Sequence, residues 1–206
     1  MSDYTIEEFY EIIKLHGITS KQGKRFLTSW NDIRANLNCP FFGNRWDDLE
    51  SRRPMTRDFY EHLLTKPSGF MTKAAKDILN DPLLDKEEKK KLTTADHVLS
   101  GQTWGTFVIA KYEELFEDNF SAYVKECLTA SQTVVSTVEE NNRFKDFTIN
   151  DETTGGTLRL RVPTENRYEA AGITKLWDSN NGKYVTEFPF ELSDEFLDFQ
   201  KEYLLI

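Results

Sequence analysis

The stretch ITKLWDSNNGKYVTEF (residues 173–188) decides the fold class, because it predicts a β-hairpin in a chain that is otherwise rich in helical patterns. The Asn181–Gly182 pair is a strong hairpin signal, since both residue types tolerate the positive φ that tight turns require. The flanking segments carry the β-branched and aromatic residues that favour strands. We therefore expect strands near 173–178 and 183–188, with Asn181–Gly182 at the tip of the turn.

A second hairpin is expected just before the first. Phe147 and Ile149 alternate with polar residues, and after the turn-rich NDETTGG the apolar Leu158, Leu160 and Val162 alternate with Thr157, Arg159 and Arg161. Alternation with a period of two is typical of strands that bury one face. The closing SDEFLDFQKEYLL predicts a helix, with Ser193 as its N-cap and acidic residues in its first turn.

The first part of the chain carries helical periodicity. The apolar residues of TIEEFYEIIKL form one stripe, Thr5 and Glu8 form a capping box, and Gly17 is a helix stop. Further helices are expected over 21–37, 56–65, 70–80 and 85–91, and LTTADHVLS (92–100) predicts a strand followed by a helical stretch.

The predicted fold class is therefore α+β: a helical N-terminal part, a central strand–helix segment that contains Asp96–His97, two C-terminal β-hairpins and a terminal helix. A single domain over 1–206 is expected. A soft boundary near 81–91 separates a helical, mildly basic part (1–85) from an acidic α+β part (92–206).

Charge is unevenly distributed along the 206 residues, whose formal net charge is −9. Residues 1–91 hold 16 Lys/Arg and 15 Asp/Glu, whereas residues 92–206 hold 10 and 20, a net charge of −10. If nucleic acid is a partner, the N-terminal part is the expected contact surface.

No apolar run is long enough to span a bilayer, and the N-terminus lacks the pattern of a signal peptide. A cytoplasmic location is therefore expected, in the host cell if the protein is viral. The two cysteines, Cys39 and Cys127, are expected to be reduced core or half-buried thiols.

The candidate chemistry centres on ADHVLS, with Asp96–His97 after a short β-type run, and on TVVSTVEENN far downstream, with Asn141 on a predicted helix. In this order of strand, Asp-His, strand and Asn-bearing helix, residues 92–145 resemble the ββα-metal core of HNH endonucleases. Asn119 is similar in place to the central Asn of that family. About forty residues separate His97 from Asn141, so residues 102–131 would be a helical insertion.

The resemblance implies a metal-dependent endonuclease that hydrolyses DNA phosphodiesters. His97 would be the general base, Asp96 and Asn141 would hold Mg²⁺ or Mn²⁺, and Asn119 would orient His97. A second group, Arg45, Arg52, Arg53 and Arg57, is interleaved with Trp46 and Phe59 and suits phosphate contacts and base stacking. The interspersed acids Asp47, Asp48, Glu50 and Asp58 make surface ion pairing the alternative for those arginines.

A different class of function is also open. The acidic C-terminal half is typical of a non-catalytic interaction protein, such as a viral or bacterial accessory factor or inhibitor, that binds a basic surface on a protein partner. A phage-encoded protein, including a structural component of a particle, is a further hypothesis that no motif carries. No P-loop, dinucleotide-binding fingerprint or nucleophile elbow is present.

Overall fold

The fold is known from a computed structural model that describes residues 4–37, 61–150 and 158–202. Its elements follow one another as α1 (Ile6–Leu15), α2 (Ser20–Leu37), β1 (Lys66–Thr72), α4 (Lys73–Asn80), α5 (Lys86–Leu92), β2 (Thr93–His97), α6 (Gly101–Ala110), η2 (Tyr112–Phe116), α7 (Phe120–Ala130), β3 (Gln132–Thr137), α8 (Val138–Arg143), η3 (Phe144–Phe147), β4 (Thr148–Asn150), β5 (Leu158–Leu160), η4 (Thr164–Asn166), α9 (Arg167–Ala170), β6 (Leu176–Asp178), β7 (Lys183–Val185) and α10 (Asp194–Glu202). The α+β class is confirmed. None of the helices in these ranges is both long and apolar enough to cross a membrane.

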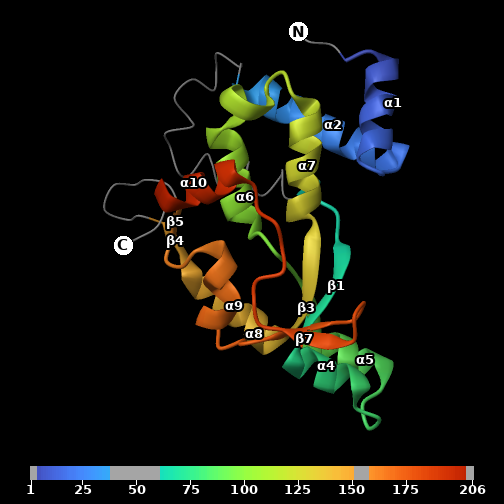
Figure 1. Ribbon diagram of the computed structural model, residues 1–206, viewed down its shortest axis with the longest axis vertical. Coiled ribbons are helices and arrows are strands. Elements are labelled where there is room, and N and C mark those ends of the chain that lie inside the picture. Colours follow the sequence, from blue (N-terminus) through green and yellow to red (C-terminus); the bar gives the residue numbers. More distant parts are fainter. Residues whose placement is uncertain (1–3, 38–60, 151–157, 203–206) are drawn as a thin grey trace.

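A five-stranded sheet in the order β2-β3-β1-β6-β7 lies below a group of helices (Figure 1). Strands β1 and β3 run parallel, and the other neighbours in the sheet are antiparallel. Strand β3 follows α7 directly, with Ser131 as the C-cap of the helix, so α7 leads from the helical region straight into the sheet.

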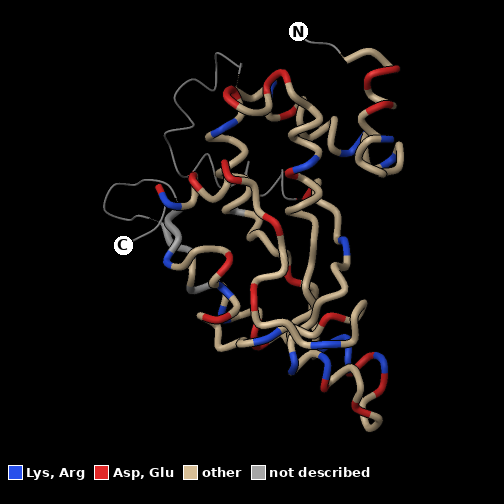
Figure 2. Tube along the Cα trace, in the orientation of Figure 1, with Lys and Arg blue, Asp and Glu red and all other residues tan. Residues whose placement is uncertain are grey.

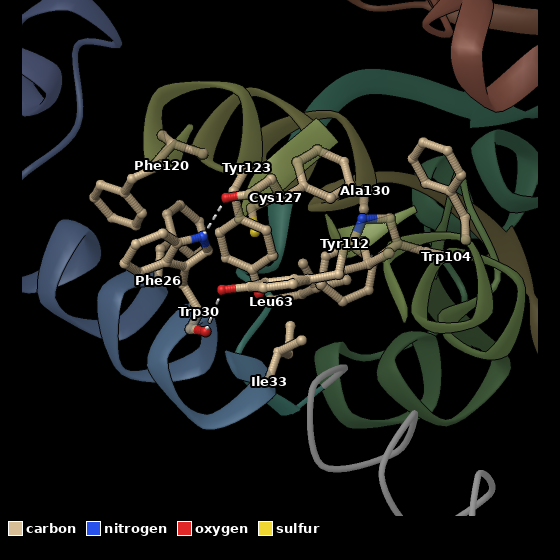
Figure 3. Packing of buried hydrophobic residues seen from close by; sticks show 14 of the residues in the cluster. Phe26, Trp30, Ile33, Leu63, Trp104, Tyr112, Phe120, Tyr123, Cys127 and Ala130 are labelled. Atoms are coloured by element: carbon tan, nitrogen blue, oxygen red, sulfur yellow. Dashed lines mark hydrogen bonds between the residues drawn. The ribbon is translucent and has the colours of Figure 1, made fainter. Parts of the chain in front are cut away.

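The helical region encloses the larger of two cores, built mainly by α1, α2, α6, η2, α7 and α10. Aromatic side chains fill it, and Figure 3 shows Trp30, Tyr112 and Tyr123 facing one another across the helices. The Trp30 indole donates to the carbonyl of Phe116 at 2.8 Å, and the Tyr112 hydroxyl donates to the carbonyl of Trp30 at 3.3 Å. The π-helical turn η2 and helix α2 thus each offer a backbone carbonyl to a side chain of the other, which satisfies two buried polar side chains.

A smaller core lies against the sheet. Its buried members are Val98, Val134, Phe144, Tyr168, Ala171, Ile173, Leu176 and Phe190. They come from the sheet, from the segment after α8 and from α9 and its flanks. The α7–β3 segment connects the two cores. It contributes Ala130 to the larger cluster and Val134 to the smaller one.

The prediction that the first part is all-helical was wrong at residues 66–72. These residues form β1, which lies in the middle of the sheet between β3 and β6. The segment KPSGFMT contains Pro67 and Gly69, which are poor strand formers, and its only fully buried residue is Thr72. Tertiary pairing on both sides overrides the weak local preference. The predicted helix over 70–80 therefore begins only at Lys73, with Thr72 as its N-cap.

The helix predicted over 56–65 was wrong at residues 62–65, which form no helix, and residues 56–60 lie outside the described residues. Other local predictions are confirmed. Thr5 and Glu8 form the capping box of α1, Gly17 follows that helix with a φ of 61°, and Ser193 accepts a bond from the backbone of Phe196 at the start of α10. Cys127 is a buried free thiol, and Cys39 lies outside the described residues.

Both predicted hairpins form. β4 pairs antiparallel with β5, and β6 pairs antiparallel with β7. In the second hairpin the carboxylate of Asp178 accepts bonds from the backbone of Asn180 and Asn181, and Gly182 has a φ of 62°. The strands are shorter than expected, because only Leu176–Asp178 and Lys183–Val185 pair.

The soft boundary near 81–91 falls between β1 and β2. Helices α4 and α5 occupy this connection, and both strands that they join belong to the same sheet (Figure 1). Residues on either side of the boundary therefore share hydrogen-bonded neighbours in β3.

Replacing Gly182 by Ala tests the hairpin turn. A Cβ at this position meets no atom within 4 Å, so the expected cost comes from the left-handed backbone alone. We expect the free energy of unfolding to fall by about 1–2 kcal/mol. Gly182→Asn is the matched control, since Asn tolerates this conformation better, and it should lose less. Urea denaturation measures both variants, and equal losses would contradict the assignment of the turn.

Candidate functional site

Strand β2 places Asp96 and His97 at its end, next to β3. Asp96 pairs with Val134 and His97 with Thr133 in an antiparallel ladder. Consecutive side chains of a strand leave opposite faces of the sheet. The side chains of the predicted metal ligand Asp96 and the predicted general base His97 therefore leave opposite faces of the sheet, and each contacts a different partner.

The carboxylate of Asp96 forms a salt bridge with Arg167, the first residue of α9. The Asp96 Oδ2 and Arg167 Nη2 atoms are 2.7 Å apart, and the two side chains are 11% and 9% exposed. A charge-assisted bond at this distance in a buried setting is strong, whereas the loss of either partner leaves the other charge buried and uncompensated.

Arg167 makes further contacts that fix its position. Its Nη1 donates to the backbone carbonyls of His97 at 2.9 Å and Val98 at 2.8 Å. The guanidinium carbon lies 4.3 Å from the centre of the Phe144 ring, a cation–π geometry. One guanidinium thus binds the carboxylate and the backbone that follows it, and it fastens α9 to the end of β2.

Burial raises the pKa of Asp96 above its ordinary value, and the charge of Arg167 and its hydrogen bond oppose that rise. A carboxyl whose pKa is raised in the folded state stabilises the fold less as the pH rises through that pKa. The ion pair therefore keeps an otherwise unfavourable buried charge in place at neutral pH.

His97 is oriented by backbone. Its Nδ1 donates to the carbonyl of Ala130 at 2.9 Å, at the C-terminal end of α7. This bond fixes a tautomer in which Nε2 is the acceptor of the neutral ring. A general base needs that tautomer, so the geometry of the ring is compatible with the predicted role.

Asn119 does not orient His97. Its side chain caps the other end of α7 and accepts a bond from the backbone of Ala122 at 3.0 Å. The 11 residues of α7 separate this cap from Ala130, a span of about 16 Å along the helix axis. The orienting contact predicted for Asn119 is made by the Ala130 carbonyl instead.

Asn141 lies on α8, directly after β3. The order β2, β3, α8, with α6 and α7 between the strands, is the strand–strand–helix order that the resemblance implied. In the part of the chain that the structure describes, no hydrogen bond joins Asn141 to Asp96. The residue before Asn141, Glu140, is buried. The Oε2 atom of Glu140 accepts from the Thr72 hydroxyl at 2.7 Å and from the Thr137 backbone N–H at 2.9 Å.

The Asp96 carboxylate already has a cationic partner, because the guanidinium of Arg167 lies beside Oδ2. Across residues 4–37, 61–150 and 158–202, no group of three His, Cys, Asp or Glu side chains is placed to hold a metal ion. The Mg²⁺ or Mn²⁺ site on Asp96 and Asn141 stays a prediction. The second group, Arg45, Arg52, Arg53 and Arg57, lies outside the described residues.

Two carboxylate-lined cavities were not predicted from the sequence. One, of 450 Å³, is lined by Glu165 and Glu169 near α9 and by Glu187 after β7. The other, of 390 Å³, lies between α7 and residues 189–193, and Glu126 and Glu191 line it. Their acids come from segments far apart in the sequence, so the only advance signal was the acidic composition of the C-terminal half.

Substituting Arg167 tests the role of the ion pair. Arg167→Met leaves Asp96 buried and unpaired, and we expect the free energy of unfolding to fall by about 3–5 kcal/mol at neutral pH. Adding Asp96→Asn should restore part of the loss, although the His97 and Val98 carbonyls still lack their donor.

The same variants have a predictable pH dependence, which urea denaturation at pH 7 and pH 5 would measure. Loss of Arg167 raises the pKa of Asp96 further, so acid protonates the carboxyl and the defect of Arg167→Met should shrink as the pH falls. If the loss in free energy of unfolding of Arg167→Met were the same at both pH values, and the same with and without Asp96→Asn, the ion pair would not be its cause.

Comparison with known proteins gave no match to a family model, to a curated protein or to a solved structure.

Proposed function

We propose that this chain is a non-catalytic interaction protein whose acidic C-terminal region binds a basic surface on a protein partner. Residues 92–206 hold 20 Asp/Glu against 10 Lys/Arg. Figure 2 shows acidic residues recurring along the chain from α9 to α10. Electrostatic complementarity of this kind steers association and selects partners.

The exposed charges of residues 162–202 are predominantly acidic. Arg167 and Asp96 pair in the interior, and this pair removes one positive and one negative charge from the surface, so the net charge outside is unchanged. The exposed acids include Glu169, Glu187 and Glu191. Three basic residues of 162–202 remain at or near the surface, namely Lys175, Lys183 and Lys201, and Lys201 pairs with Asp198.

The cavity beside α9 is the observation that carries the proposal. Three carboxylates, Glu165, Glu169 and Glu187, outnumber the one cationic side chain of its lining, Lys175, and the apolar side chains of Ile173, Leu176, Val185 and Phe188 also line it. Lysine and arginine place an alkyl stem on apolar surface and keep the charged head among polar groups. A volume of 450 Å³ lies within the range of small-molecule pockets, about 300–1,000 Å³, and so has room for such a side chain.

Binding of a defined basic peptide tests the proposal. The probe is a fluorescent decapeptide of alternating Lys and Arg, titrated with the full chain at increasing salt. We expect saturable binding that weakens steeply with salt, because exposed charges are screened. Glu169→Gln with Glu187→Gln should weaken it by about tenfold or more, since each lost charge contact is worth about 1 kcal/mol.

The control is a second double variant with the same change in net charge. Glu11→Gln with Glu87→Gln removes two exposed carboxylates from α1 and α5, outside the C-terminal region of residues 92–206. It should bind the peptide almost as wild type does. Equal weakening in both double variants would mean that net charge alone drives binding, and absence of binding at low salt would refute the proposal.

The nuclease hypothesis predicts a different result. Supercoiled plasmid incubated with the protein and Mg²⁺ or Mn²⁺ would be nicked, and His97→Ala would abolish nicking while the half-buried His62→Ala would not. Under the proposed interaction function, we expect no metal-dependent nicking above background in any of the three proteins. If His97→Ala abolished nicking and His62→Ala did not, the nuclease hypothesis would be supported and the proposed interaction function would be rejected.

A further inference from the structure

A surface cavity, here called the Glu126 cavity, lies between α7 and residues 189–193. Lys125, Glu126 and Thr129 of α7 form one wall, Gln132 of β3 adds to it, and residues 189–193 form the other. Its volume is 390 Å³, whereas one water molecule occupies about 30 Å³ in the liquid. The space is therefore large enough for a side chain or a small ligand.

Glu126 is the unusual residue of this cavity. Its side chain belongs to a residue that is only 7% exposed, and Oε2 has no hydrogen-bond partner among the described residues. A buried carboxylate oxygen without a donor is costly, and such groups in a folded protein call for an explanation. A donor supplied from outside the chain would remove the cost.

The charges around Glu126 favour a cationic donor. Two further carboxylates lie close by, Glu191 in the cavity wall and Glu195 on α10. Lys125 is the one basic residue of the wall, but it is exposed, and no salt bridge joins it to Glu126 in the part of the chain described. Burial raises the pKa of Glu126, and a bound cation would lower it again.

We propose that the Glu126 cavity binds the guanidinium of an arginine side chain of the partner. Five N–H donors in a planar fork match the unpartnered Glu126 oxygen together with the Glu191 carboxylate and the hydroxyls of Thr129 and Ser193. The apolar side chains of Phe190 and Leu192 accept the alkyl stem. This inference rests on the proposed function and names the group of the partner that is recognised.

Calorimetric titration of the full chain with N-acetyl-arginine amide tests the proposal. The neutral control ligand is N-acetyl-citrulline amide, which has nearly the same shape and no charge. We expect saturable binding of one arginine derivative per chain and no detectable binding of the citrulline derivative. Putrescine, a free diamine without the planar fork, should bind more weakly than the arginine derivative.

Variants locate the site. Glu126→Gln keeps the shape of the side chain and should weaken binding by about ten- to a hundredfold, the value of a lost charged hydrogen bond. Glu191→Gln, at an exposed position of the same wall, should also weaken it. Glu195→Gln is the matched control, because Glu195 influences Glu126 electrostatically but does not line the cavity, and it should change the affinity less than about threefold.

Each result decides the matter. Equal binding of the arginine and citrulline derivatives, or equal weakening by Glu195→Gln and Glu126→Gln, overturns the proposal, as does putrescine binding as tightly as the arginine derivative. If the basic decapeptide binds the chain but Glu126→Gln leaves its affinity unchanged, the interaction function stands and the Glu126 cavity is not its arginine site. If the arginine derivative binds but the decapeptide does not, arginine binding in the Glu126 cavity is supported and the proposed interaction function is rejected.

Discussion

The guanidinium of Arg167 holds the end of β2, and with it the start of α6, against α9. It pairs with Asp96, caps the carbonyls of His97 and Val98 and lies over the ring of Phe144. Val98 and Phe144 belong to the smaller core, so a single side chain connects a strand end, a helix start and a hydrophobic cluster. Buried ion pairs add little net stability, whereas the loss of one partner leaves the other charge buried and uncompensated.

The second structural constraint is the direct passage from α7 through β3 to α8. Phe120, Tyr123 and Val124 are buried in the helical core, Val134 is buried in the smaller core, and Thr137 then caps α8. His97 is held at the joint of α7 and β3 by the Ala130 carbonyl. Asp96 and His97 are therefore both held by contacts within the fold, Asp96 by Arg167 and His97 by the Ala130 carbonyl.

The proposed function rests on the carboxylates at the surface. The buried pair of Arg167 and Asp96 carries no net charge, so it leaves the excess of acidic residues in this region unchanged. The two acid-lined cavities differ in kind. The one beside α9 combines exposed carboxylates with an apolar floor, whereas the Glu126 cavity contains a buried oxygen that lacks a donor. A basic partner surface with an arginine at the right place would satisfy both.

Local signals in the sequence determined the α+β class, the capping box of α1, the Asn181–Gly182 turn and the strand that carries Asp96 and His97. These features depend on residues within a few positions of one another, and a sequence records such contacts directly. The acidity of the C-terminal half can also be counted directly from the sequence.

Only the tertiary structure decided that Lys66–Thr72 is a central strand, because its pairing partners β3 and β6 lie about 65 and 105 residues away. It alone placed Arg167 beside Asp96, 71 positions apart, and Asn119 at the far end of α7 from His97. It alone left Glu126 buried without a donor, because burial and partnership depend on long-range packing that no local pattern of residues encodes.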